Sequence, residues 1–317
     1  MVPLEAFPLA GKRVWVTGGS GFLGRRVLAE LIRRGAAPLA PSSQDCDLLD
    51  PSAAARFIRE HRPQAVIHLA AKVGGIGANR KHPGYFFFTN LAMGMHLIEA
   101  CRTEGIDKLL VAGTVCAYPK FCPVPFREDD IWDGYPEETN APYGIAKKAL
   151  LVQLQAYRQE YGTRGIFLLP VNLYGPDDHL DPENNHVIPA LIRKFLEAGA
   201  AGAATVELWG TGSASREFLF VQDAAEAICE AMAKYEDPEP VNLGTGEEIS
   251  IRDLALKLKA MTGFQGELVF NAAYPDGQPR RKLDTTRALE RFGWQARVGL
   301  DDGLGETIAW MRQTLSL

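Results

Sequence analysis

The sequence has little surplus charge, no long apolar run and no paired arrangement of cysteines. Across 317 residues the net formal charge is −5, which gives no overall attraction to nucleic acid or to an anionic membrane. No apolar run approaches the ~20 residues that span a bilayer. The first twelve residues do not resemble a signal peptide, and the five cysteines lack metal-ligand spacing. We therefore expect a soluble cytoplasmic protein without a bound metal.

What is present is an alternation of apolar strands and amphipathic helices in the first half of the chain. Strands are predicted at residues 13–17, 65–70, 109–112 and 165–169, and the helices between them include 22–34, 83–104 and 143–161. This alternation predicts βαβ units and an α/β fold with a Rossmann-type, doubly wound parallel sheet. We expect a dinucleotide-binding domain at 1–170, with 217–245 returning to it, and a smaller C-terminal α/β substrate lobe from 171–216 and 246–317.

A glycine-rich loop joins the first predicted strand to the first predicted helix. Glycines at 18, 21 and 24 allow a tight turn and let the backbone approach a pyrophosphate at the helix N-terminus. The loop therefore predicts a dinucleotide site. The expected contacts are Gly18, Gly19, Ser20, Gly21, Phe22, Leu23 and Gly24.

The choice of dinucleotide depends on the residues after the second predicted strand. Residues 40–44 offer no carboxylate for a ribose 2′-hydroxyl, which favours NADP and leaves NAD open. They offer no arginine for a 2′-phosphate either, although Ser42, with Ser43 and Arg25, could serve. Asp47 and Leu48 are expected near the adenine, unless Asp47 belongs to a solvated turn. Further cofactor contacts are predicted from Ala70, Ala71, Pro170, Asn172 and Leu173.

Tyr143 and Lys147 lie one turn apart on a predicted helix, and Thr114 follows an apolar strand. The spacing places the phenol and the ammonium on one helix face. The lysine charge should then lower the tyrosine pKa from its usual ~10. A tyrosine of this kind exchanges a proton with a carbonyl or alcohol oxygen. The pattern indicates an enzyme that moves a hydride and a proton at one carbon.

Longer motifs resemble the extended short-chain dehydrogenase/reductase family, and within it the enzymes that epimerise and reduce GDP-4-keto-6-deoxymannose. The resemblance implies NADP-dependent 3,5-epimerisation and 4-keto reduction of a nucleotide-sugar, with a GDP-4-keto-6-deoxyhexose favoured. It also implies a homodimer, which would form through helices 83–104 and 143–161. The motifs are residues 71–76, 116–120, 142–147, 172–176, 186–191, 209–212, 216–218 and 275–277.

The same resemblance implies a division of labour. Thr114, Tyr143 and Lys147 would perform the redox step, while Cys116 and His186 would act as base and acid in epimerisation. A C4 ketone acidifies the hydrogens on C3 and C5, which is why such a pair can invert them. On an extended segment Cys116 would point to the same side as Thr114. His186 is also expected at the cofactor, and substrate contacts are implied for Val73, Asn172, Lys194, Trp209, Arg216 and Asp276.

Departures from the family pattern leave alternatives open. Val115 stands where the family has a second hydroxyl, and Lys194 stands where it tends to have arginine, which loses a bidentate clamp. A nucleotide-sugar 4-epimerase would not need Cys116 or His186, and a single-function C3/C5 epimerase or 4-reductase also remains open. Residues 280–282, all basic, either contact phosphate or only solvate a loop.

Two of the implied substrate contacts have ordinary structural alternatives. Trp209 either stacks on a guanine or fills the core of the lobe. Arg216 either contacts a diphosphate or makes a surface ion pair.

Overall fold

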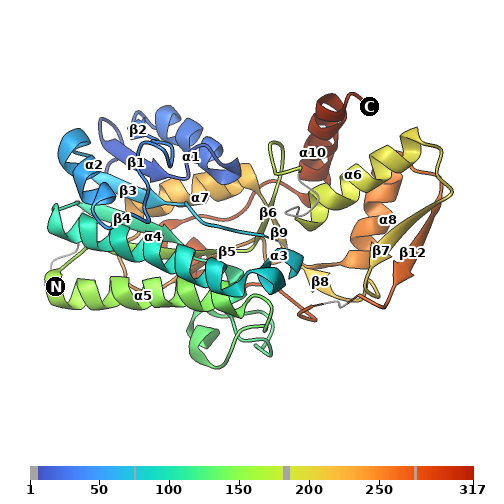
Figure 1. Cartoon of the computed structure of the whole chain (residues 1–317). Helices are drawn as coiled ribbons and strands as arrows, with labels where there is room; N and C mark the ends of the chain where they lie inside the picture. Colours follow the sequence, from blue (N-terminus) through green and yellow to red (C-terminus); the bar gives the residue numbers. More distant parts are fainter. Residues whose placement is uncertain (1–5, 75, 181–185, 275–276) are drawn as a thin grey trace.

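A six-stranded parallel sheet organises the chain in the computed structural model, which describes residues 6–74, 76–180, 186–274 and 277–317 (Figure 1). The strand order is β2-β1-β3-β4-β5-β10, so the direction of winding reverses beside β1, where open α/β sheets bind ligands. The strands are β1 Arg13–Thr17, β2 Ala37–Leu39, β3 Ala65–His68, β4 Lys108–Ala112, β5 Gly165–Pro170 and β10 Val241–Leu243.

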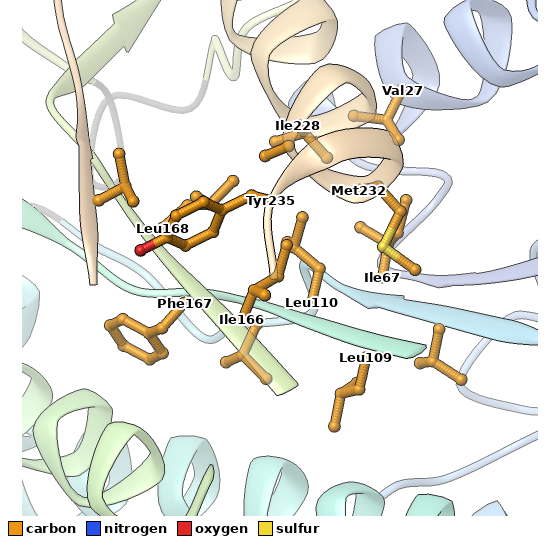
Figure 2. Packing of buried hydrophobic residues seen from close by; sticks show 14 of the residues in the cluster. Val27, Ile67, Leu109, Leu110, Ile166, Phe167, Leu168, Ile228, Met232 and Tyr235 are labelled. Atoms are coloured by element: carbon orange, nitrogen blue, oxygen red, sulfur yellow. The ribbon is translucent and has the colours of Figure 1, made fainter. Parts of the chain in front are cut away.

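Helices cover both faces of this sheet, which confirms the predicted doubly wound fold. One layer contains α1, α7 and α9, and the other contains α2, α4 and α5 (Figure 1). Figure 2 shows Val27 of α1 and Met232 of α7 packed over strand residues such as Ile67. Strands β3, β4 and β5 are apolar at nearly every position because both of their faces are buried. The helices are α1 Phe22–Arg33, α2 Ala53–His61, α4 Pro83–Thr103, α5 Ala141–Tyr161, α7 Val221–Lys234 and α9 Thr286–Phe292.

A second cluster of buried apolar side chains lies beyond the carboxyl ends of the strands, between α6, α8, α10 and the small β7–β12 sheet (Figure 1). Two further pairs are β6 with β9 and β8 with β11, and Tyr174 of β6 and Phe218 and Phe220 of β9 belong to this second cluster. The elements are β6 Asn172–Tyr174, α6 Val187–Ala200, β7 Thr205–Trp209, β8 Ser215–Arg216, β9 Phe218–Phe220, β11 Ile249–Ser250, α8 Ile251–Thr262, β12 Glu267–Asn271 and α10 Leu300–Leu315.

Residues 283–294 return to the first cluster although they follow α8 and β12 in the sequence. Leu283, Phe292 and Trp294 are buried there, against the main sheet and its helices. The sequence did not predict α2 or α9, nor the short elements α3 Ile76–Lys81, η1 Val115–Ala117 and η2 Glu128–Trp132. In the described part of the chain, no helix is both long and apolar enough to cross a membrane.

Candidate active site

The carboxyl end of β4 leads directly into a tight turn that carries Thr114 and Cys116. The Thr114 side-chain oxygen accepts a hydrogen bond from the Cys116 backbone N–H at 3.1 Å and so caps the 3₁₀ turn η1. The expectation of an extended segment here was wrong, because a hydroxyl that binds the backbone two residues on favours a turn. Val115 is buried in the first core, so the position lacking the family's second hydroxyl faces the core.

Helix α5 packs directly on this turn at Gly144. A Cβ added to Gly144 would lie 2.5 Å from the Cys116 carbonyl oxygen, which is closer than real Cβ contacts. The absence of a side chain therefore lets the helix backbone reach η1. As a result the half-buried Tyr143 lies close to the side chains of Thr114 and Cys116, and both influence its pKa. The structure thus brings together the hydroxyl, the thiol and the phenol predicted from sequence.

Lys147 completes this group in a different way from the one expected. Its ammonium lies 6.0 Å from the centre of the Tyr143 ring and donates to the Ala112 carbonyl oxygen at 2.9 Å. Burial lowers the pKa of Lys147 to about 8. Burial and the nearby Cys116 raise the pKa of Tyr143, although the Thr114 hydrogen bond lowers it. The predicted fall in the tyrosine pKa was therefore wrong, because desolvation of the phenol outweighs a lysine that interacts with a carbonyl.

The glycine-rich loop is shaped so tightly that side chains would not fit. Gly18 has a φ of +70°, and a Cβ there would lie 2.9 Å from the Ala70 backbone. A Cβ on Gly24 would lie 2.1 Å from the Gly18 carbonyl oxygen. Helix α1 begins after Gly21, which provides no side-chain cap for the first N–H groups. This geometry fits a dinucleotide pyrophosphate bound at the start of α1.

The ends of the neighbouring strands are joined around this loop. The Thr17 hydroxyl accepts from the Ala70 backbone N–H at 3.2 Å and also pairs with His68 Nδ1 at 2.8 Å. Ala71 follows directly, so both alanines predicted at the cofactor lie at the carboxyl end of β3. Pro170 ends β5, and Leu173 lies in β6 beyond it.

The loop after β2 carries the side chains predicted near the adenosine. Ser42 is exposed, and its hydroxyl donates to Asp45 at 2.7 Å. The sequence did not identify Asp45, the carboxylate that holds Ser42. Arg25 uses its Nε to donate to the Ser20 carbonyl oxygen at 3.0 Å.

Asp47 and Leu48 are the residues predicted near the adenine. Asp47 accepts from the Leu49 N–H at 3.0 Å, as in an Asx turn, and Leu48 is buried.

The loop after β3 is held by asparagines. Asn90 of α4 is buried and bonds both to the N–H and to the carbonyl oxygen of Lys72, each at 2.9 Å. Asn79 donates to the Gly74 carbonyl oxygen at 2.7 Å. Val73 lies between these anchors and is exposed, so it is available to a ligand. Sequence reasoning missed Asn90 because only the folded structure brings α4 beneath the loop.

His186 pairs with a buried carboxylate, Asp178, that the sequence did not identify as its partner. It lies at the N-terminus of α6, on the end of that helix nearer the main sheet (Figure 1). Its Nδ1 is 3.1 Å from an oxygen of Asp178, whose side chain is fully buried. Desolvation lowers the pKa of His186, but the hydrogen bond and charge of Asp178 raise it more, so the net shift is upward. The imidazole is thereby favoured in its protonated, acid form.

Three of the predicted substrate contacts, Lys194, Trp209 and Arg216, come from α6, β7 and β8. Trp209 is 64% exposed and does not fill the lobe core; its ring stacks on Tyr274 with centroids 4.4 Å apart and planes 8° apart. The Lys194 ammonium lies 5.9 Å from the Trp209 ring centre and donates to the Glu207 carbonyl oxygen. Arg216 is half-buried and donates to the Gln278 carbonyl oxygen at 2.6 Å. Asp276 lies outside the described residues.

The structure places a buried arginine, Arg281, beside Cys116, which the sequence did not predict. Arg281 is only 7% exposed, and its Nη1 is 3.7 Å from the Cys116 sulfur and 3.4 Å from the Asn172 side-chain oxygen. Asn172 also donates from its amide to the Glu217 carbonyl oxygen at 2.9 Å. The solvated-loop interpretation fits Arg280, which is exposed and pairs with Glu248, but not Arg281. The run of basic residues was the only sequence signal for Arg281.

Two surface cavities lie away from this group. One is lined by residues such as Tyr235 and Arg291, and the other by residues such as Met95 and Tyr157. Neither cavity is lined by a predicted catalytic residue. The candidate site is therefore located by the positions of its side chains and not by a cavity. Among the described residues, no group of three or more His, Cys, Asp or Glu side chains could hold a metal ion.

Comparison with known proteins agrees with this geometry. Residues 14–244 match the model of the NAD dependent epimerase/dehydratase family. The chain is 42% identical to "Probable GDP-L-fucose synthase 1" of Oryza sativa subsp. japonica over 95% of this chain and 92% of that protein. A GDP-6-OMe-4-keto-L-xylo-heptose reductase from C. jejuni superimposes with a TM-score of 0.91, at 27% identity, over 98% of this chain and 100% of that one. A GDP-L-fucose synthetase from Naegleria fowleri bound to NADP superimposes with a TM-score of 0.87, at 26% identity, over 98% of both chains. The chain therefore belongs to the NAD dependent epimerase/dehydratase family.

Proposed function

We propose that this enzyme uses NADPH to epimerise and reduce a GDP-4-keto-6-deoxyhexose, with inversion at C3 and C5 before reduction at C4. The proposal rests on the group at the end of β4: Thr114 caps the turn that carries Cys116, and helix α5 packs on this turn at Gly144, which places Tyr143 beside both residues. A hydroxyl, a thiol and a phenol there can act on one carbonyl and its neighbouring carbon. The NADP-bound solved relative and the glycine loop support NADP as the cofactor.

In the reduction step Tyr143 is the proton donor. The upward shift of its pKa keeps the phenol protonated at neutral pH, which is the form needed to protonate an alkoxide. Bound NADPH supplies the hydride to C4 of the sugar. Thr114 would donate a second hydrogen bond to the same oxygen, and Lys147, buried beside Tyr143, would hold the nicotinamide ribose and return a proton to Tyr143.

In the epimerisation steps Cys116 removes a proton next to the ketone, and His186 delivers one to the opposite face. Thr114 and Tyr143 stabilise the enolate oxygen through hydrogen bonds. The raised pKa of His186 supports its role as the acid, because its paired carboxylate favours the charged imidazole. If the sugar shifts between steps, the same pair can serve both C3 and C5.

The remaining residues are assigned to binding. We place the pyrophosphate of the cofactor at 18–24 and its adenosine near Ser42, Asp47 and Leu48. Ala70, Ala71, Pro170, Asn172, Leu173 and His186 would line the nicotinamide side. On the substrate, Trp209 would stack on the base, Lys194 and Arg216 would approach the diphosphate, and Val73, Asn172 and Asp276 would contact the sugar.

Isotope labelling distinguishes the proposed epimerase and reductase activity from that of a single-function 4-reductase or a 4-epimerase. GDP-4-keto-6-deoxymannose would be incubated with the enzyme in deuterated water, with and without NADPH. We expect deuterium at C3 and C5 and one NADPH consumed per product. In Cys116→Ser the label should be lost. Label that persists without Cys116 would contradict the base assignment, and turnover without NADPH loss would indicate a 4-epimerase.

We further propose two domains, a homodimer and a cytoplasmic location. The two clusters of buried side chains support a dinucleotide-binding domain at 1–170 with 217–245 and a substrate lobe at 171–216 and 246–317. The exceptions are Val171 and 283–294, which pack with the larger domain, and Phe218 and Phe220, which pack with the lobe. Helices α4 and α5 pack together and expose Tyr85, Phe88, Met95 and Val152, which supports pairing of these helices between subunits. All five cysteines are free thiols, which supports a reducing compartment.

A further inference from the structure

Arg281 presents a buried positive charge to the sulfur of Cys116. Its Nη1 lies 3.7 Å from the sulfur, within hydrogen-bond range for that atom, and 3.4 Å from the Asn172 side-chain oxygen. A guanidinium keeps its proton throughout the physiological range, so this charge is permanent. Burial of such a group is costly unless its N–H groups donate hydrogen bonds. The other N–H groups of Arg281 therefore need partners.

Gln278 holds the guanidinium in place. Its side-chain oxygen accepts from Arg281 Nε at 3.2 Å and from Nη2 at 3.1 Å, which leaves Nη1 directed at Cys116 and Asn172. The Gln278 amide donates in turn to the carbonyl oxygens of Pro119 and Lys120, at 3.2 and 3.1 Å. These residues follow the turn that carries Cys116, so the thiol and the guanidinium belong to one connected hydrogen-bonded structure.

The chain after Arg281 is fixed as well. The Leu283 N–H donates to the buried carboxylate of Glu217 at 2.6 Å, and the Lys282 carbonyl oxygen accepts from the Phe126 N–H at 2.8 Å. Within the described ranges, Arg281 makes no salt bridge with a carboxylate, and its side-chain partners are neutral amides and Cys116. Its positive charge is therefore available to the sulfur.

We propose that Arg281, held by Gln278, is the positioning residue that stabilises Cys116 as a thiolate and fixes the direction of its sulfur. The inference rests on the proposed function, in which Cys116 is the base. The thiolate takes a proton from C3 or C5, the electron pair of the C–H bond passes into the enolate, and the sulfur becomes a thiol. Arg281 keeps its own proton and favours the thiolate, so the thiol releases its proton to solvent water before the next proton removal.

The other groups that face Cys116 do not provide this charge. Tyr143 of α5 is a phenol held neutral at physiological pH, and Thr114 contributes a hydroxyl from the same turn. Asn172 of β6, which accepts from the same Nη1 of Arg281, contributes a neutral amide. A change in the pH dependence of the thiol on removal of Arg281 is therefore assigned to the guanidinium.

The test measures thiol reactivity without substrate or cofactor. The full-length protein is treated with iodoacetamide across a pH series, and alkylation of the Cys116 peptide is followed by mass spectrometry. In Arg281→Gln we expect alkylation of Cys116 about tenfold slower at neutral pH, with the pH profile moved to higher pH, since a hydrogen bond to a charged group is lost. Arg281→Lys should retain part of the rate. Arg280→Gln, which removes the exposed neighbouring charge, should match the unchanged protein.

The buried Cys101 reports whether each variant is folded, because it should stay unreactive in the native state. Equal rates and pH profiles for Arg281→Gln and the unchanged protein would overturn the inference. If Arg281→Gln exposes Cys101, Gln278→Ala decides instead: slower alkylation of Cys116 with Cys101 protected supports the inference, and an unchanged rate overturns it. Failure here alongside normal Cys116-dependent deuterium exchange would leave the proposed function intact, whereas loss of that exchange would contradict the function itself.

Discussion

Tyr143 and Lys147, on the sheet side of the candidate site, contrast with Trp209 and Lys194 on the other side in burial and in what holds them. Lys147 is 1% exposed and is bonded to the backbone of β4, and Tyr143 lies half-buried beside the turn that carries Thr114. Trp209 is 64% exposed and contacts mainly another exposed aromatic ring, Tyr274. The first pair is fixed by the core of the protein, whereas the second lies on a surface that a ligand could cover.

The difference corresponds to two physical tasks. Proton transfer requires groups held within hydrogen-bond reach of the reacting atoms, and rigid surroundings provide this. Recognition of a nucleotide base can rely on exposed rings, because every base has a π-face on which an aromatic side chain can stack. We therefore expect substitutions on the sheet side to act on kcat and substitutions on the other side to act on KM.

The largest effect is expected for Tyr143→Phe. Loss of the proton donor should reduce C4 reduction by about 10²–10⁴-fold, with a smaller effect on exchange at C3 and C5. NADPH absorbance would follow reduction, and labelling would follow exchange. Tyr161→Phe, at the far exposed end of the same helix, is the control. A normal rate of reduction in Tyr143→Phe would contradict the assignment of the proton donor to the sheet side of the site.

Gly144→Ala tests the contact that brings α5 to the Cys116 turn. An alanine in a helix ordinarily stabilises by up to ~1 kcal/mol over glycine. Here overpacking against the Cys116 carbonyl should dominate and lower the free energy of unfolding by about 1–3 kcal/mol, with loss of epimerisation. Gly199→Ala, in α6 with open space around its Cα, should be neutral or stabilising. Equal denaturation midpoints for the two variants would contradict the close packing.

Asp178→Asn tests the pairing that holds His186. Because Asp178 raises the pKa of His186, the pair stabilises the fold most below ~6.5 and loses this contribution as pH rises through the folded-state pKa. The variant should lower that pKa and slow epimerisation by roughly tenfold near neutrality, since a charge-assisted bond is lost. The high-pH limb of the rate profile should move to lower pH. Asp177→Asn, which breaks only the Arg26 ion pair, should keep the original profile.

The smallest effect is expected for Trp209→Ala. Loss of one stacking partner should raise KM about threefold to tenfold and leave kcat nearly unchanged. Steady-state kinetics with the GDP-sugar would measure both constants. Trp132→Ala, another exposed tryptophan, serves as the control. A fall in kcat without a change in KM would contradict the expectation that substitutions on this side of the site act on KM.

Much of the fold could be predicted because its signals are local. Runs such as 109–112 and 165–169 are apolar at every position, as central strands of a parallel sheet require. The i to i+4 spacing of Tyr143 and Lys147 fixed their shared helix face. The turn at Thr114 was missed because the choice between strand and turn depended on one side-chain hydrogen bond.

Amino-acid sequence by itself determined the order of strands and helices, the glycine loop and the Tyr143–Lys147 face, because each depends on residues close together in the chain. Tertiary structure alone decided that Arg281 lies at Cys116 and that desolvation raises the pKa of Tyr143. Both depend on contacts between segments far apart in sequence and on the exclusion of water, which no local pattern encodes.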